Sequence, residues 1–133
     1  MISKRKNLFL YSKLRKLKHE KAPKLIDKII AEADKNGIIV DNLIEDLMLL
    51  RTYAVEEKNP VVAKALRLTV EHLEDNEAFI IPIPTDEPLE EESDQTQLIV
   101  GTESFIYLMN LIKKSLNVLN KEEIREYNKL MQL

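Results

Sequence analysis

The chain contains no cysteine and no tryptophan, only two glycines, and only 5% aromatic residues. The absence of cysteine excludes disulfides, cysteine-ligated zinc, iron–sulfur clusters and thiol catalysis. It also agrees with a reducing compartment, and the cytoplasm is the location that we expect. So few glycines and aromatic residues argue against a β fold with many turns. The composition therefore favours an all-α protein.

Motifs for catalysis and for nucleotide binding are also missing. Gly37 and Gly101 cannot build a glycine-rich phosphate loop, and no serine stands in a nucleophile-elbow motif. Neither His19 nor His72 has a partner at the spacing of a zinc-protease or di-iron helix. We therefore predict no catalytic residue, no cofactor and no metal ion. An enzyme that combines carboxylates with His72 in an interhelical cleft is the least favoured alternative.

Charge is distributed very unevenly along the chain. The first 28 residues hold ten basic and two acidic residues, a net charge of +8. The other 105 residues hold 10 basic and 21 acidic residues, a net charge of −11. Residues 71–94 alone contain ten acids and no lysine or arginine. A charge asymmetry of this size carries information about binding partners rather than about the fold.

The basic N-terminal segment is predicted to form an amphipathic helix over residues 3–20, because Leu10, Leu14 and Leu17 recur at helical spacing. We expect its charge to complement the acidic segment, within one chain or between two copies. The alternative is a face that contacts the phosphates of nucleic acid. The residues predicted to contact a polyanion or an acidic partner are Lys4, Arg5, Lys13, Arg15, Lys16, Lys18 and Lys21.

Helix start signals divide the next part of the chain. Pro23 suits the first turn of a helix, Asp41 can cap another, and Asn59 followed by Pro60 is an N-cap with a proline at the first helical position. The helices predicted from these signals and from the apolar periodicity cover residues 23–36, 41–58 and 60–76.

Residues 77–101 break the helical pattern. Two apolar runs, 79–83 and 98–100, flank an acidic, turn-rich stretch. We expect either an extended connector or a short β-hairpin in which these runs pair. Pro82 and Pro84 would restrict a strand here to the edge of a sheet.

Two further helices are predicted at the C-terminus. Thr102 can cap the first, and Asn120 can cap the second with the spacing of a capping box. The first carries a wide apolar stripe that continues to Leu119. If the four preceding helices close a bundle, this stripe needs another surface, and a two-fold homodimer is the commonest solution. The predicted interface residues are Phe105, Leu108, Met109, Ile112 and Leu116.

The sequence as a whole predicts a single all-α domain, a bundle of five or six helices with an extended or short β-hairpin insertion near residues 77–101. Its parts are a four-helix unit (1–76), an acidic connector (77–101) and a C-terminal helical pair (102–133). No membrane span is expected at the N-terminus, where the apolar run is four residues long against the roughly 20 that a span requires. The expected function is that of a small, non-catalytic protein–protein interaction or assembly protein that forms a homodimer or binds another protein. The main alternative is a nucleic-acid-binding or regulatory protein.

Overall fold

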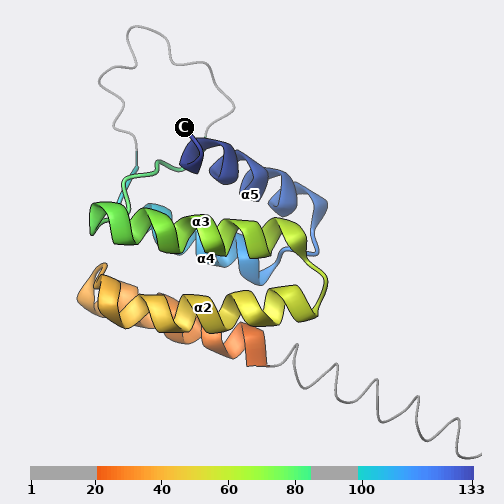
Figure 1. Ribbon diagram of the computed structural model, residues 1–133, viewed down its shortest axis with the longest axis horizontal. Helices are drawn as coiled ribbons and strands as arrows, with labels where there is room; N and C mark the ends of the chain where they lie inside the picture. The colour runs from red at the N-terminus through yellow and green to blue at the C-terminus, as the bar shows by residue number, and fades with distance from the viewer. Residues whose placement is uncertain (1–20, 85–98) are drawn as a thin grey trace, which may run out of the picture.

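The computed structural model describes residues 21–84 and 99–133, and within these ranges it is all-helical. Its helices are residues 21–36, α2 (Val40–Glu56), α3 (Pro60–Asn76), α4 (Thr102–Lys113) and α5 (Val118–Met131). Successive helices run in opposite directions along the bundle (Figure 1). The prediction of an all-α helical bundle is confirmed. The predicted helix over residues 3–20 lies outside the described residues.

A single apolar core joins the helices. The α3 helix packs against both α2 and α5, and α4 packs against α5. Every helix contributes side chains with no exposed surface to one continuous cluster. Examples from successive helices are Ile29, Leu47, Leu66, Met109 and Ile124. Burial of such a side chain contributes about 1.5–3 kcal/mol, so packing across the helices stabilises the bundle.

The boundary between α2 and α3 agrees with its sequence signal. Asn59 is the N-cap of α3, and Pro60 occupies the first turn, where a missing N–H costs nothing. The start of α2 differs slightly from the prediction. Its N-cap is Ile39, and Asp41 lies in the first turn, where a carboxylate interacts favourably with the positive end of the helix dipole.

Of the two expectations for residues 77–101, the β-hairpin is not supported by the described residues. The described residues of the two apolar runs, 79–83 and 99–100, form no strand. Two backbone hydrogen bonds join them. The N–H of Ile83 donates to the carbonyl of Ile99 at 3.0 Å, and the N–H of Gly101 donates to the carbonyl of Phe79 at 2.8 Å. The runs therefore lie side by side without forming a ladder.

A side-chain interaction occupies the position that a ladder would use. The carbonyl of Ile81 accepts a hydrogen bond from the hydroxyl of Ser104 at 2.7 Å. Pro82 and Pro84 also fix their φ angles and provide no N–H group. The alternative expectation, an extended connector, describes the segment up to residue 84, and residues 85–98 lie outside the described part of the chain.

Phe79 attaches this extended segment to the bundle. Its side chain is 1% exposed, and its ring lies edge-on to His72 and to Phe105, at centroid distances of 5.5 and 5.6 Å. Gly101, which returns the chain to α4, has φ of 76° and ψ of −143°, a conformation essentially restricted to glycine. Both residues thus define the end of the bundle from which residues 85–98 depart.

Candidate functional site

Three large aliphatic side chains are exposed at the opposite end of the bundle. Leu116, Val118 and Leu119 are 81%, 72% and 74% exposed. They lie in the α4–α5 loop and at the start of α5, at the same end as residue 21 and the α2–α3 turn (Figure 1). We call these three residues the aliphatic tip. Single exposed apolar residues are normal on protein surfaces, whereas three in one short segment form a candidate interaction surface.

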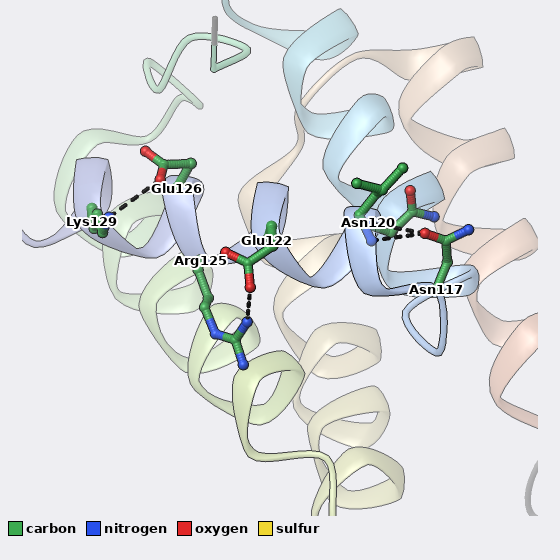
Figure 2. Close-up of polar contacts among 7 residues, drawn as sticks. Asn117, Asn120, Glu122, Arg125, Glu126 and Lys129 are labelled. Atoms are coloured by element: carbon green, nitrogen blue, oxygen red, sulfur yellow. Dashed lines mark hydrogen bonds and ion pairs between the residues drawn. The ribbon is translucent and has the colours of Figure 1, made fainter. Parts of the chain in front are cut away.

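Side-chain hydrogen bonds hold the loop that carries the aliphatic tip (Figure 2). The side-chain oxygen of Asn117 accepts hydrogen bonds from the backbone N–H groups of Leu119 at 2.8 Å and Asn120 at 3.3 Å. The Asn120 side chain donates to the carbonyl of Lys114 at 3.1 Å. The sequence predicted Asn120 as the N-cap, but the cap is Asn117, three residues earlier. The exposed side chains of the tip are therefore carried by a segment that hydrogen bonds hold in place.

Replacing Asn117 with alanine is expected to lower the free energy of unfolding by about 0.5–2 kcal/mol, because two N–H groups at the start of α5 lose their acceptor. Urea denaturation measures this change. Asn110→Ala, on the exposed side of α4, is the control and should alter stability by no more than about 0.5 kcal/mol. Equal effects of the two substitutions would contradict the assignment of Asn117 as the cap.

A cavity of about 90 Å³ opens beside the aliphatic tip, with Leu116 among its lining residues. Asn59 donates a hydrogen bond to the hydroxyl of Ser115 at 3.0 Å, which joins the α2–α3 turn to the α4–α5 loop. The apolar part of the lining includes Ile26, Leu50, Ala54, Val62 and Ile112. The volume is far below the roughly 300–1,000 Å³ of small-molecule sites, so the cavity is too small for a typical small-molecule ligand.

Lysines surround this end of the bundle. Lys58 follows α2, Lys114 follows α4, and Lys121 lies in the first turn of α5. Lys21 and Lys24 lie in the helix 21–36, beside two residues that line the cavity. Within the described residues none of these five lysines forms an ion pair. Their charge is therefore available to a partner.

The acids near the aliphatic tip are engaged in interactions within the chain. Asp27 forms an ion pair with Lys113 at 2.6 Å. Glu122 forms an ion pair with Arg125 on the outer face of α5 (Figure 2). Glu56 and Glu57, at the end of α2, also have interactions of their own. The uncompensated charge around the tip is thus positive.

His72 lies far from the tip, near the C-terminal end of α3. Its Nε2 atom accepts a hydrogen bond from the backbone N–H of Ile80 at 3.1 Å, and Nδ1 lies 3.2 Å from the side-chain nitrogen of Asn76. Burial lowers the pKa of His72, and the carboxylate of Asp75 partly opposes this shift. These contacts give the neutral ring a structural role in holding the extended segment.

Protonation of His72 is expected to weaken the fold, because a proton on Nε2 would face the N–H of Ile80. The folded state lowers the pKa, so the unfolded chain binds the proton more readily. The stabilising contribution is therefore complete above pH 6.5, the ordinary value, and is lost as the pH falls below it. Urea denaturation between pH 7.5 and about 5 measures this loss. His72→Gln should flatten the pH dependence, and an unchanged profile would contradict the prediction.

Two tyrosines form a separate polar cluster inside the bundle. The hydroxyl of Tyr107 donates to the carboxylate of Glu123 at 2.6 Å, and this hydrogen bond raises the pKa of Tyr107 to about 12. Tyr127 has no exposed surface, and its hydroxyl donates to the carbonyl of Ser104 at 3.1 Å. Burial also raises the pKa of Tyr127. Both phenols therefore stay protonated at neutral pH.

The predicted interface stripe lies mostly inside the core of its own chain. Phe105, Leu108 and Met109 have no exposed surface, Ile112 is 4% exposed, and Leu116 alone is on the surface. The interface hypothesis therefore stays a prediction in which Leu116 is the accessible member. The sequence placed Leu119 in the same apolar stripe but not among the predicted interface residues, and it did not single out Val118. The signal that could have found them is an asparagine N-cap two residues before Leu119.

Only one of the residues predicted to contact a polyanion or an acidic partner lies in the described part of the chain. Lys21 is exposed at the start of the helix 21–36, at the same end of the bundle as the aliphatic tip. The others, Lys4, Arg5, Lys13, Arg15, Lys16 and Lys18, lie outside the described residues. The basic N-terminal segment nevertheless joins the bundle at this end.

Residues 21–84 and 99–133 offer neither a metal site nor a membrane-spanning helix. No group of three or more His, Asp or Glu residues there could hold a metal ion, and no helix there is long and apolar enough to cross a membrane. Comparisons with protein-family models, curated proteins and solved structures find no match to the chain. The function is therefore inferred from the surface of this protein alone.

Proposed function

We propose that this protein is a non-catalytic interaction or assembly protein that binds a protein partner through the aliphatic tip. The observation that carries the proposal is the 72–81% exposure of three large aliphatic side chains on a hydrogen-bonded loop. Covering one such side chain contributes about 1.5–3 kcal/mol. An ordered segment that leaves three of them in water gains stability when a partner covers them.

The lysines around the tip restrict the chemistry of that partner. A two-fold contact through the tip would bring Lys114 and Lys121 of one copy towards the same lysines of the other, and like charges at an interface are unfavourable. A partner with an apolar centre and an acidic rim satisfies both the tip and the lysines. The cavity beside Leu116 offers space for one of its side chains.

A photo-reactive amino acid at position 118 tests this proposal. The full chain with benzoylphenylalanine in place of Val118 is produced in its native cells and irradiated, and cross-linked proteins are identified by mass spectrometry. Position 74 provides the control, because Glu74 is exposed on α3 near the opposite end of the bundle. We expect discrete protein adducts from position 118 and only background from position 74. The same background from both positions would contradict the proposal.

Polyanion binding is the second candidate function. The observation that favours it is that the basic N-terminal segment joins the bundle beside Lys24, Lys58 and Lys114, none of which forms an ion pair within the described residues. Binding to labelled single- and double-stranded nucleic acid that weakens steeply between about 50 and 200 mM salt would support it. No binding at the lower salt concentration would exclude it. Polyanion binding ranks second, because the exposed aliphatic side chains of the tip cannot donate hydrogen bonds to phosphates.

A further inference from the structure

We propose that the partner at the aliphatic tip is a second copy of this chain, and that residues 85–98 of that copy dock on the tip. This inference rests on the function proposed above and specifies its partner. The two copies then associate head to tail, since the described residues on either side of 85–98 lie at the end of the bundle opposite the tip.

The composition of residues 85–98 complements the aliphatic tip. The segment contains six acids and no base, and Leu89 lies among those acids. The tip has the converse composition, with aliphatic side chains at its centre and five lysines around them. A leucine flanked by carboxylates therefore matches both the apolar centre and the charged rim. The acids are Asp86, Glu87, Glu90, Glu91, Glu92 and Asp94.

The length of residues 85–98 favours docking on the tip of a second copy over docking on the tip of their own chain. Its two attachment points are held together by the hydrogen bond from Ile83 to Ile99, beyond the C-terminal end of α3. The 17 residues of α3 span about 25 Å between that end and the tip. A 14-residue loop that goes out and back reaches about 24 Å only when each half is fully extended. A neighbouring molecule can present its tip without this restriction.

Charge favours a head-to-tail arrangement over a two-fold one. Head-to-tail contact places the acids of one copy against Lys58, Lys114 and Lys121 of the next, whereas two-fold contact through the tip places these lysines against one another. A head-to-tail assembly has an unused tip at one end and an unused acidic segment at the other. Further copies can therefore add to it, and association continues into rings or longer chains. Because exposed charges contribute to it, association should weaken as salt increases.

Sedimentation velocity of the full-length protein tests the inference. We expect self-association between about 10 µM and 1 mM protein at about 50 mM salt, and at least tenfold weaker association at about 500 mM salt. One variant reverses the tip charges (Lys58→Glu, Lys114→Glu, Lys121→Glu). The other reverses the segment charge from −6 to +6 (Asp86→Lys, Glu87→Lys, Glu90→Lys, Glu91→Lys, Glu92→Lys, Asp94→Lys). Each variant alone should associate at least tenfold more weakly, with a circular dichroism spectrum unchanged from that of the natural chain.

An equimolar mixture of the two variants provides the decisive control. Every contact between unlike variants pairs opposite charges, so the mixture should associate again. A natural chain that stays monomeric, or association that neither reversal weakens, would overturn the inference. If the chain is monomeric while position 118 cross-links to a different protein, this inference fails and the proposed function stands. If the chain is monomeric and position 118 gives only background, both fail.

Discussion

Replacing Phe79 with alanine is expected to lower the free energy of unfolding by about 3–5 kcal/mol, the usual cost of truncating a buried aromatic side chain. The Phe79 ring is in contact with three others, with centroids 5.5 Å from His72, 5.6 Å from Phe105 and 6.4 Å from Tyr127. Removing it leaves a space between rings that belong to different elements and cannot easily close. Urea denaturation at pH 7.5 measures the change.

The neighbouring residue is the matched control for this prediction. Ile80 is 55% exposed, so Ile80→Ala should change stability by no more than about 0.5 kcal/mol. The comparison separates loss of packing by one side chain from any general effect of a substitution in the extended segment. Similar losses for both variants would mean that Phe79 does not anchor this segment.

Changing the three residues of the aliphatic tip to serine is expected to reduce recovery of bound partner at least tenfold. The partner is recovered with a tagged full-length chain from native cells and measured by quantitative mass spectrometry. The loss follows because the substitutions remove the apolar centre of the contact and leave the lysines in place. Stability should change little, by less than about 1 kcal/mol, because Leu116, Val118 and Leu119 are mostly in water in the isolated bundle.

A second exposed apolar surface supplies the control for the tip. Met48, Leu49 and Val55 are exposed on α2, where Met48 and Leu49 line an open groove that includes Arg67 and Glu71 of α3. Serine at these three α2 positions removes the same number of exposed apolar side chains, and should leave partner recovery unchanged. Loss of the partner from the α2 variant, with full recovery by the tip variant, would assign binding to α2 instead.

The helices could be predicted where apolar periodicity and start signals agree. In α3, Asn59 and Pro60 mark the start, and Ala65, Leu66 and Leu73 recur at helical spacing and are buried. Local preference and tertiary packing favour the same conformation there. The overall all-α class followed from such segments and from the low glycine content.

The exposure of the tip was not predicted, because the sequence offers two asparagine caps three residues apart and the prediction used the later one, Asn120. The apolar spacing of Ile112, Leu116 and Leu119 allows one helix to continue to Asn120. In the structure α4 ends at Lys113, and Asn117 caps α5. The same leucines therefore project from a loop and from the first turn of α5, instead of joining the core. A helical repeat alone does not distinguish these outcomes.

The hairpin prediction failed for a different reason. Two apolar runs separated by a turn-rich stretch indicate a pair of strands, and backbone bonds do join them at two points. The sequence cannot show that the hydroxyl of Ser104, more than 20 residues further along, takes the carbonyl of Ile81. This long-range hydrogen bond uses a carbonyl group that pairing between two strands would otherwise need.

The rate of cysteine labelling at the aliphatic tip tests the central claim most directly. The natural chain has no cysteine, so Val118→Cys introduces a single reporter, and Glu74→Cys provides a control at the other end of the bundle. If a partner covers the tip, a maleimide should modify position 118 at least tenfold more slowly in native cells than in dilute purified protein, relative to position 74. Equal relative rates in cells and in dilute solution would show that nothing covers the tip and would contradict the account.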